Sequence, residues 1–426
     1  MNFKELIFGK EDIEDVKERH AVPLSLKDCI RGSLMAGAAG DALGYAVEFM
    51  RLEQIRSRYG MQGITQFELD ANGKALVSDD TQMTLFTANG LLVGYTRWRM
   101  KGIGAGLADY VPAAYVDWFY TQTTDMRPSP FPNREERPYT WLRYLPELAH
   151  RRAPGNTCMD ACERLMHHQE PQNNSKGCGG IMRVAPMGLF EASIEARTNK
   201  VIYEPDELAV QGAKIAKATH RHPLGYLPAS LLTLLVARLV PLSPDEARKR
   251  IVPIVKEVLG TVMCMDELVQ EREMLRIITL KAINLAKSAL SDEESIKQLG
   301  EGWTGEEAWA IALFCAIRHI DNMRDAIIAA VNHDGDSDST GSITGNIMGA
   351  IYGYEAIKQD RLFCPEGKDF EDTIELADII LALADDLSAD CTLSEEVYYR
   401  TKTPGELQWI DRYLHGKPAG LKQSAN

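Results

Sequence analysis

The amino-acid sequence predicts an all-α fold, a single large domain of many helices packed at orthogonal angles. Three observations support this class. Helix-start signals followed by apolar residues at helical spacing recur throughout residues 205–331. Two other segments carry small residues at every fourth position, which places those residues along one face of a helix. The chain has neither strand–helix alternation nor a repeat period, so a parallel sheet and a solenoid are both disfavoured.

Length and composition describe an ordinary globular protein. Of the 426 residues, 45% are hydrophobic, which is enough for a large core. We expect an N-terminal arm at 1–24, one helical domain at 25–415 and a C-terminal tail at 416–426. The formal net charge of −14 and the lack of a Lys/Arg-rich run argue against a nucleic-acid surface.

Targeting and cysteine patterns indicate a cytoplasmic location, and we also expect a monomer. The first residues are charged throughout and lack an apolar stretch, so we expect neither secretion nor a membrane span. The eight cysteines contain no CxxC pair, which suits reduced thiols. Cys158, Cys162 and His167 fit no common zinc spacing, and buried helix positions are the preferred interpretation.

Two small-residue stripes predict a close helix pair. The first lies on a helix at about 27–45 and the second on a helix at about 340–355. Each interior glycine costs roughly 1 kcal/mol relative to alanine, so the repeated glycines imply that another backbone lies against them. We therefore predict that the two helices pack together. The stripes are Gly32, Ala36, Gly40 and Gly44, and Gly341, Gly345, Gly349 and Gly353.

The next segment combines a turn with an acidic helix start. Asn72-Gly73 separates two short β-favouring runs between Ile64 and Val77, which predicts a hairpin. Ser78, Asp79 and Asp80 then open a helical run. An N-cap accounts for one acidic residue, but two adjacent carboxylates repel each other unless a cation neutralises them.

Three segments in the middle of the chain are predicted to be loops or turns. Residues 121–140 contain four prolines and predict a long surface loop or lid. Residues 154–157 form a turn into a helix. The glycine-rich stretch 173–183 suits a phosphate or a closely approaching ligand, with a flexible connector as the alternative. His220 and His222 predict a ligand wall or a cap rather than a metal site.

The C-terminal half is predicted to be helical. Capping boxes are expected at Ser243, Ser291 and Thr304, each followed three residues later by glutamate. Two more helices are expected at 372–387 and 394–400. The tail after His415 should be frayed.

A second acidic helix start occurs at residues 332–341. Asp334, Asp336 and Asp338 alternate along the chain and lead into Ser339. An EF-hand is excluded because its sixth position lacks glycine and its twelfth lacks glutamate. An N-cap and a solvated acidic turn stay open as alternatives to a metal site.

Pooling the acidic helix starts gives a set of ligands that are all oxygens. Glu48 belongs with them because it follows the first small-residue helix, seven residues after Asp41 and on roughly the same face. Such a set suits Mg²⁺ or Mn²⁺, and two divalent cations about 3.5–4 Å apart would form a binuclear site between helices. The set comprises Glu48, Ser78, Asp79, Asp80, Asp336, Asp338 and Ser339.

Five ordered motifs between residues 27 and 390 resemble the ADP-ribosylglycohydrolase (ADP-ribosyl hydrolase) family, whose bacterial members include the enzyme that reactivates dinitrogenase reductase. The motifs are GDALGYAVE, SDDTQMTL, KGCGGIMR, THRHP and GDSDSTGSITGNIMGA. The resemblance implies an all-α fold, a binuclear magnesium or manganese centre, and hydrolysis of the glycosidic bond between ADP-ribose and an acceptor. The expected substrate is an ADP-ribosylated protein side chain, such as arginine, or a small ADP-ribose conjugate.

The resemblance also implies roles for individual residues. Glu48 would lie at the centre as a gated ligand or as a general acid/base. We take it as the first choice for the carboxylate that manages the proton, with Asp79 as the second. The implied metal ligands are Ser78, Asp79, Asp80, Asp336, Asp338 and Ser339. The implied substrate-binding residues are Asn156 near the proximal ribose, Gly177, Cys178, Gly179 and Gly180 along the ribose and diphosphate, and His220 at the diphosphate.

Two departures from the family pattern leave other functions open. Asp334 replaces a usual glycine, and Ala153 stands where the dinitrogenase-reductase branch carries an aspartate. A two-metal phosphohydrolase acting on a nucleotide-like substrate would use the same ligand types. A non-catalytic binding or immunity protein that retains the fold is the third hypothesis.

Overall fold

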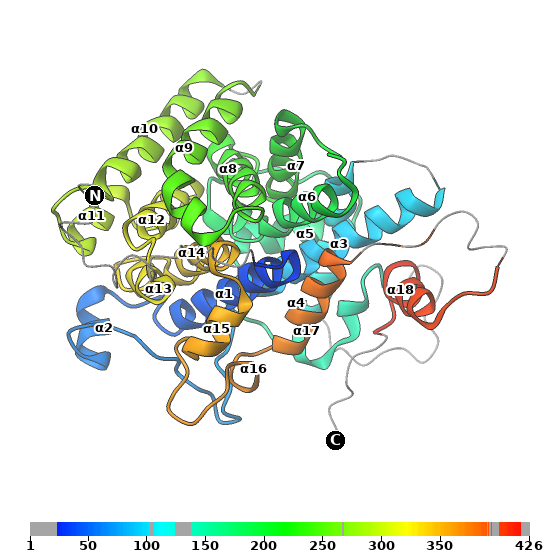
Figure 1. The fold of residues 1–426 in the computed structure, drawn as a ribbon, viewed down its shortest axis with the longest axis horizontal. Helices are drawn as coiled ribbons and strands as arrows, with labels where there is room; N and C mark the ends of the chain where they lie inside the picture. The colour runs from blue at the N-terminus through cyan, green and yellow to red at the C-terminus, as the bar shows by residue number, and fades with distance from the viewer. Residues whose placement is uncertain are drawn as a thin grey trace, which may run out of the picture.

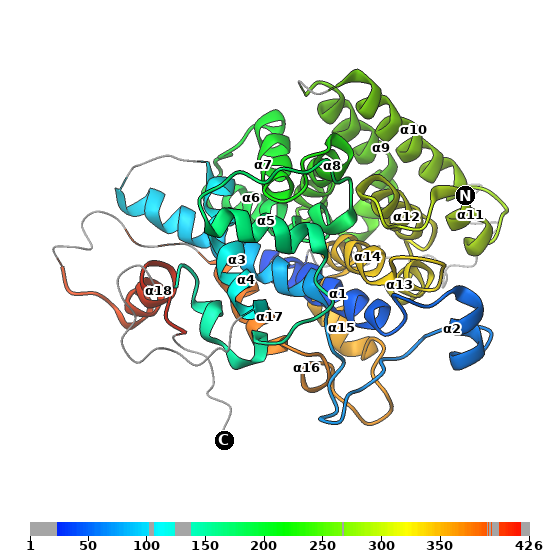
Figure 2. The same ribbon diagram turned by 180° about the vertical axis from the view of Figure 1, so that it is seen from behind.

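A computed structural model describes residues 24–101, 106–123, 138–265, 268–389, 391, 393 and 400–418. This part of the chain is built from helices and contains no β-strand, which confirms the predicted fold class. Figure 1 and Figure 2 show the helices from opposite sides. The α-helices are α1 (Leu26–Tyr45), α2 (Leu52–Tyr59), α3 (Asp79–Lys101), α4 (Val111–Thr123), α5 (Asn156–Met166), α6 (Ala185–Thr198), α7 (Pro205–Lys217), α8 (Pro223–Leu239), α9 (Pro244–Met263), α10 (Val269–Leu285), α11 (Asp292–Leu299), α12 (Gly305–Arg318), α13 (Met323–Val331), α14 (Ser337–Tyr352), α15 (Tyr354–Asp360), α16 (Phe370–Thr373), α17 (Ala377–Ser388) and α18 (Pro404–His415).

Helices α1 and α14 lie side by side at the centre of the molecule in both views (Figure 1, Figure 2). Their backbones touch along the predicted small-residue stripes. A Cβ atom on Gly40 would lie 2.1 Å from the carbonyl oxygen of Gly341, and one on Gly345 would lie 2.0 Å from that of Ala36. The prediction that these two helices pack together is confirmed.

The contacts also show that the two helices run antiparallel. Gly32, near the start of α1, faces Gly349, near the end of α14. At the other end, a Cβ atom on Gly44 would lie 2.6 Å from the Cα atom of Asp338. The end of α1 therefore meets the acidic start of α14. One detail of the prediction is wrong: Gly353 adopts φ +76° and lies beyond the end of α14.

The other helices surround this pair. Helices α13 and α12 pack against α14, while α17 and α15 pack against α1. Helices α7 to α10 form a neighbouring group, drawn in green in Figure 1. Large fully buried side chains fill the interior, among them Trp118, Trp141 and Trp309.

Side-chain caps determine several helix starts. Capping boxes are present at Ser243 and Ser291, as predicted. The prediction at Thr304 is wrong, because its hydroxyl does not cap α12 and the residue pairs with Gly177 in an isolated bridge instead. A capping box at Thr403, which the sequence analysis did not single out, opens α18.

Other expectations need correction. The predicted hairpin is wrong: the turn at Asn72-Gly73 exists, but no strands flank it, and Ala75 pairs with Ile374 in an isolated bridge. The helix expected at 372–387 is interrupted at 374–376 between α16 and α17. Residues 121–123 end α4, whereas most of the predicted loop and of the helix at 394–400 lies outside the described residues.

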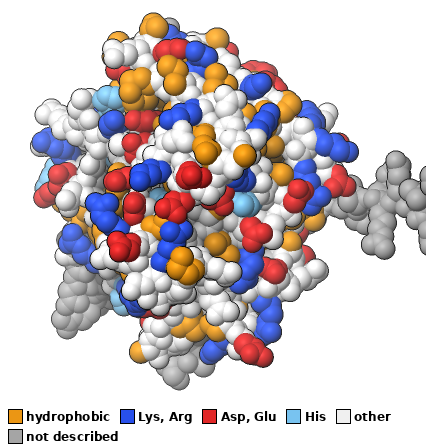
Figure 3. All heavy atoms as spheres, turned by 90° about the vertical axis from the view of Figure 1, so that its left-hand side faces the viewer, with side chains coloured by type: hydrophobic (Ala, Val, Ile, Leu, Met, Phe, Trp, Pro, Cys, Tyr) orange, Lys and Arg blue, Asp and Glu red, His pale blue; other side chains and the backbone are white. Residues whose placement is uncertain are grey.

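Three further features bear on the expectations from composition. Within the described ranges, no helix is long and apolar enough to cross a membrane. Within the part of the chain that the structure describes, no disulfide links the cysteines. On the face that carries α2 and α11, acidic and basic side chains are interspersed and form no continuous basic area (Figure 3).

The close helix contact predicts an unusual response to alanine. In an ordinary helix Gly→Ala stabilises by about 1 kcal/mol. We expect Gly345→Ala to lower the free energy of unfolding by about 1–3 kcal/mol instead, because the new methyl group meets the backbone of α1. The matched control is Gly260→Ala in α9, where nothing lies within 4 Å of the added atom and stability should be unchanged or higher. Urea unfolding measures both, and equal effects would contradict the packing argument.

Candidate active site

Three chain segments bring carboxylates together. Glu48 lies in the turn after α1, Asp79 and Asp80 open α3, and Asp336 and Asp338 open α14. All five side chains are buried, with at most 8% of their surface exposed. The tight packing of α1 on α14 brings the first and third segments together.

Asp41, on α1, fixes the position of the second segment. Its carboxylate accepts hydrogen bonds from the backbone N–H groups of Ser78 at 3.0 Å and Thr81 at 3.0 Å, and from the hydroxyl of Thr81. Asp41 thus satisfies backbone donors at the start of α3, as an N-cap does, but from another helix. The Ser78 hydroxyl accepts a further bond from the N–H of Asp80 at 3.2 Å.

Local hydrogen bonds shape the start of α14. Asp336 is the N-cap and accepts from the N–H of Ser339 at 3.2 Å, while Asp338 accepts from the same N–H at 2.9 Å. The thiol of Cys178 donates to the second oxygen of Asp336 at 2.7 Å. The N-cap interpretation is therefore correct for Asp336, but it does not account for the other carboxylates gathered here.

Burial and mutual repulsion raise the pKa values of these carboxyl groups. Burial, followed by the charge of Asp338, raises the pKa of Glu48 to about 10 and that of Asp41 to about 7. The same two causes hold the pKa values of Asp79 and Asp80 well above the ordinary aspartate value, as they do for Asp336. Among the described residues, no lysine or arginine is a main influence on the pKa values of these carboxyl groups.

Unpaired oxygens test whether divalent cations fit this cluster. Among the described residues, one oxygen each of Glu48 and Asp80 is buried without a hydrogen-bond partner, although buried carboxylate oxygens are normally paired. Carboxylates and hydroxyls are also the ligands that Mg²⁺ and Mn²⁺ prefer. The donor set therefore fits. Within the described ranges, however, no three acidic, histidine or cysteine side chains are already oriented around one ion, so binding requires side-chain rotation.

Asp334 has a different environment from its neighbours. Its carboxylate accepts from the N–H of Leu52 at 2.7 Å and so caps the start of α2. The side chain is partly exposed and makes a structural contact between α2 and the segment before α14. The extra carboxylate of this chain is accounted for without a role in the cluster.

The glycine-rich loop lies beside His220. A Cβ atom on Gly177 would lie 3.2 Å from His220 Nε2, and one on Gly179 would lie 2.9 Å from its Cε1. Gly180 faces α8, where an added Cβ would lie 2.3 Å from the carbonyl oxygen of Gly225. These three glycines are thus needed for packing, whatever else they contact. His222 caps α8, as the capping interpretation predicted.

Asn156 is exposed at the start of α5 and follows Gly155, whose backbone N–H group hydrogen-bonds to Asp79. The N–H of Asp79 donates to the carbonyl oxygen of Arg152 at 3.0 Å, which ties the approach to α5 to the start of α3. Thr157 follows and donates to the hydroxyl of Ser175, just before the glycine loop, at 3.2 Å. Asn156 and the loop therefore border the same region.

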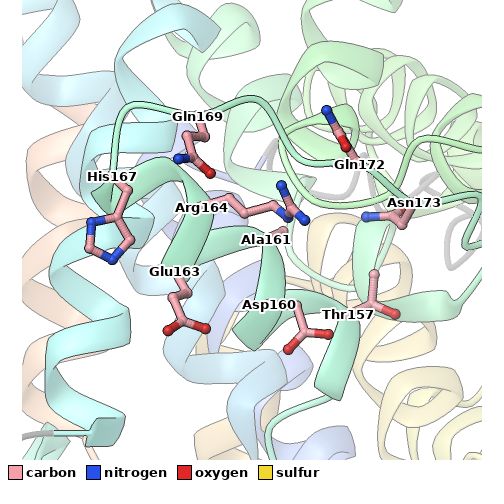
Figure 4. A pocket seen from close by; sticks show the side chains of 9 residues that line it. All are labelled: Thr157, Asp160, Ala161, Glu163, Arg164, His167, Gln169, Gln172 and Asn173. Atoms are coloured by element: carbon pink, nitrogen blue, oxygen red, sulfur yellow. The ribbon is translucent and has the colours of Figure 1, made fainter.

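A pocket of about 420 Å³ opens along α5, within the size range of small-molecule sites. In Figure 4, Arg164 of α5 extends toward the segment that carries Gln169 and Gln172. Thr157 and Asn173 line its end near the glycine loop. There is thus space for a small ligand next to the loop.

Two kinds of supporting residue were missed by the sequence analysis. Asp41 was noted only for its helix face, although an aspartate inside a run of small residues signals a polar contact between helices. Arg183 and Thr219 belong to the motifs KGCGGIMR and THRHP but were given no role, and only the tertiary structure shows that both are fully buried and bonded to each other.

Fold and site together define an all-α protein with a buried acidic cluster at the ends of packed helices. The family model described as ADP-ribosylglycohydrolase matches residues 23–395. The chain therefore belongs to the ADP-ribosylglycohydrolase family. The resemblance inferred from the five motifs is confirmed, and with it the predicted enzyme class, a glycohydrolase.

Curated relatives are similar at low identity. The ADP-ribosyl-[dinitrogen reductase] glycohydrolase of Rhodospirillum rubrum is 24% identical, over 84% of this chain and 98% of that protein. ADP-ribosylhydrolase ARH3 of Mus musculus is 26% identical over 51% of this chain, and the match spans only 60% of that relative. A solved structure titled ADP-ribosylglycohydrolase-related protein complex has a TM-score of 0.53 and 19% identity, and covers 85% of this chain and 98% of its own. At that identity the match supports the fold alone.

The raised pKa values predict a pH-dependent stability for metal-free protein. A carboxyl group with a raised native pKa holds its proton longer in the native state, so its contribution is complete below its unfolded value and is lost as pH rises through the native value. We expect the free energy of unfolding to fall from about pH 6.5 to about pH 10, because the contribution of Asp41 is lost by about pH 7 and that of Glu48 continues to fall until its native pKa of about 10 is reached. Burial lowers the pKa of His220 to about 3, so this residue makes the free energy of unfolding rise with pH, but only below its ordinary pKa of 6.5.

Two variants test whether the cluster is the cause. Asp338→Asn removes the charge that acts on all the other carboxyl groups and should flatten the slope. Asp334→Asn lies four residues earlier in the chain, but that side chain is directed at α2, so this variant should keep the wild-type slope. Urea unfolding at several pH values in a chelator gives the measurement. A wild-type stability that is constant or rises over this range would contradict the electrostatic argument.

Proposed function

We propose that the protein is a divalent-cation-dependent hydrolase that cleaves the glycosidic bond between ADP-ribose and an acceptor. The observation that carries this proposal is the buried carboxylate cluster, with its unpaired oxygens on Glu48 and Asp80, in a chain of the ADP-ribosylglycohydrolase family. The absence of a disulfide among the described residues suits a cytoplasmic location.

Two cations, Mg²⁺ or Mn²⁺, would be held by residues from the starts of α3 and α14. When bound, they would supply Lewis-acid polarisation, orient ribose hydroxyls and activate a water molecule. The ligands that we propose are Ser78, Asp79, Asp80, Asp336, Asp338 and Ser339. Their burial explains how the site excludes competing bulk water.

Hydrolysis adds water across the bond between the anomeric carbon and the acceptor. The acceptor leaves with a proton, and a carboxyl group must move that proton. Glu48 is the first candidate because it lies outside the proposed ligand set and its raised pKa keeps it protonated in metal-free protein; Asp79 is the second. The surrounding carboxylates stabilise positive charge that develops on the ribose.

The diphosphate side of the substrate is assigned to the glycine loop. Gly177, Cys178, Gly179 and Gly180 border this region together with His220 and Asn156. The pocket along α5 offers space beyond the loop for the nucleoside end. A two-metal phosphohydrolase and a binding protein stay as alternatives, separated by the identity of the product.

An exposed aromatic pair borders the same site. Phe49 follows Glu48 and is 74% exposed, and its ring stacks on that of Trp303 at 6.4 Å between centroids and 21° between planes. The backbone of Trp303 accepts a hydrogen bond from the N–H of Cys178. Aromatic faces attract the planar cation of arginine. We therefore propose that this pair contacts the acceptor, with an arginine side chain as the preferred group.

Activity should separate two neighbouring aspartates. With an ADP-ribosylated arginine peptide and Mg²⁺ or Mn²⁺, we expect Asp336→Asn to lose at least about 100-fold in kcat, because a ligand of the proposed centre is removed. Asp334→Asn should keep activity within a few-fold of the wild type, because that carboxylate caps α2. Release of free ADP-ribose is measured by chromatography. Full activity of Asp336→Asn would show that the proposed centre is wrong.

Removal of the cations tests the metal dependence directly. Dialysis against a chelator should abolish release of ADP-ribose, and added Mg²⁺ or Mn²⁺ should restore it. Product analysis separates the alternatives, because a phosphohydrolase would release AMP or phosphate from the same conjugates. Tight binding of conjugates without any product would favour the binding protein.

The aromatic pair predicts acceptor selectivity. We expect Phe49→Ala and Trp303→Ala to lower kcat/KM for an arginine conjugate by roughly 2- to 30-fold relative to a serine conjugate, the range of a lost cation–π contact. Inhibition by free ADP-ribose should not change. Trp98→Ala on α3 is the matched control, since Trp98 and Trp303 are each 40% exposed. An equal loss of ADP-ribose inhibition would assign the pair to the ADP-ribose half instead.

A further inference from the structure

Arg183 is a fully buried cation next to the candidate site. Its guanidinium carbon lies 4.3 Å from the centre of the Tyr115 ring. One terminal nitrogen donates to the sulfur of Met83 at 3.1 Å and to that of Cys158 at 3.4 Å. The other donates to the hydroxyl of Thr219, and Nε has no partner.

All these partners of Arg183 are uncharged. Burial is the main cause that raises the pKa of Tyr115 to about 12 and that of Cys158 above its ordinary value, so both stay neutral. Among the described residues, no carboxylate forms an ion pair with Arg183. A guanidinium remains charged even when buried, and burying an unpaired charge is costly. Its position therefore calls for an explanation beyond packing.

Thr219 connects Arg183 to His220. The Thr219 hydroxyl accepts from Arg183 and lies 2.9 Å from His220 Nδ1. A hydroxyl has one hydrogen to give, and the other acceptors in reach are the carbonyl oxygen of Ala216 at 3.4 Å and the sulfur of Cys158. The shorter contact favours donation of the hydroxyl hydrogen to His220 Nδ1. The adjacent Arg183 cation polarises the hydroxyl and strengthens this donation. Asn173 holds this backbone by donating to the Thr219 carbonyl oxygen at 2.8 Å.

The opposite edge of the His220 ring faces the glycine loop. Nε2 lies beside Gly177, where an added Cβ would come within 3.2 Å of it, and within the described residues Nε2 has no hydrogen-bond partner. A neutral imidazole that accepts at Nδ1 carries its proton on Nε2. The ring therefore presents a free N–H group at the loop.

We propose that Arg183, acting through the Thr219 hydroxyl, holds His220 as a neutral imidazole with its proton on Nε2, and that this fixed N–H group donates to an oxygen of the anionic ligand at the Gly177–Gly180 loop. Arg183 and Thr219 are thus positioning residues. This inference rests on the proposed function, since the ligand is the diphosphate of ADP-ribose. A buried positive charge at this location also favours an anion without contacting it.

The electrostatics of His220 agree with this arrangement. Burial, followed by the charge of Arg183, lowers the pKa of His220 to about 3. Recognition of the diphosphate should then be independent of histidine protonation across the neutral range. A site that used a histidine cation would instead lose affinity as pH rises through about 6.5.

The first test is the tautomer itself. Nitrogen-15 NMR of histidine-labelled full-length protein reports which ring nitrogen carries the proton, and His220→Gln identifies the signal among the nine histidines. We expect a protonated Nε2 and an unprotonated Nδ1, unchanged from about pH 5 to about pH 8. A proton on Nδ1, or a ring that becomes cationic in this range, would overturn the proposal.

The second test alters the connecting hydroxyl. Thr219→Val keeps the shape of the side chain but cannot donate, so both tautomers should appear and the Kd for ADP-ribose in Mg²⁺ should rise about tenfold. Thr219→Ser retains the hydroxyl and should behave like the wild type. Arg183→Met removes the cation from a site with neutral partners and should shift the tautomer in the same direction as Thr219→Val. Unchanged tautomer and Kd in Thr219→Val would contradict the inference.

These readouts are separate from turnover. If the wild type binds ADP-ribose but hydrolyses no conjugate, the proposed catalytic function fails while the NMR and binding results still decide the role of Thr219. If Thr219→Val binds normally while the wild type releases ADP-ribose, the catalytic function stands and the positioning role is wrong.

Discussion

The direct contact between the backbones of α1 and α14 is the constraint on which the site depends. Glycine and alanine at every fourth position let the two helices approach until carbonyl oxygens of one nearly touch the other. Each glycine lowers the intrinsic stability of its helix. The close approach that the glycines allow brings the end of α1 onto the start of α14. Glu48 and Asp338 come together for this reason.

Charge is distributed unevenly around that contact. Carboxylates meet on one side, where burial and mutual repulsion raise their pKa values and leave oxygens unpaired. Behind the glycine loop lies Arg183, a buried cation whose contacts are all neutral. Cations would complete the first region and an anionic ligand the second. The proposed metal ions and diphosphate would meet these two requirements, and on this basis we propose that the two regions form one site.

Residues of one chemical type have different tasks here. Asp336 and Asp334 lie two positions apart, yet one caps α14 inside the cluster and the other caps α2 outside it. Asp41 contributes a third carboxylate function, since it satisfies backbone donors of α3 and so places Ser78. The number of acidic residues in a motif therefore says little about how many take part in chemistry.

The amino-acid sequence by itself determined the helical class, the pairing of α1 with α14, and the expectation that Glu48 joins two acidic helix starts. These features follow from local periodicity, because residue spacing sets which side chains share a helix face. Only the tertiary structure decided that Asp334 turns to α2, that the Thr304 hydroxyl does not cap α12, and that Arg183 reaches His220 through Thr219. Each of these depends on contacts between segments distant along the chain, and hydrogen bonds of that kind leave no periodic pattern in a sequence.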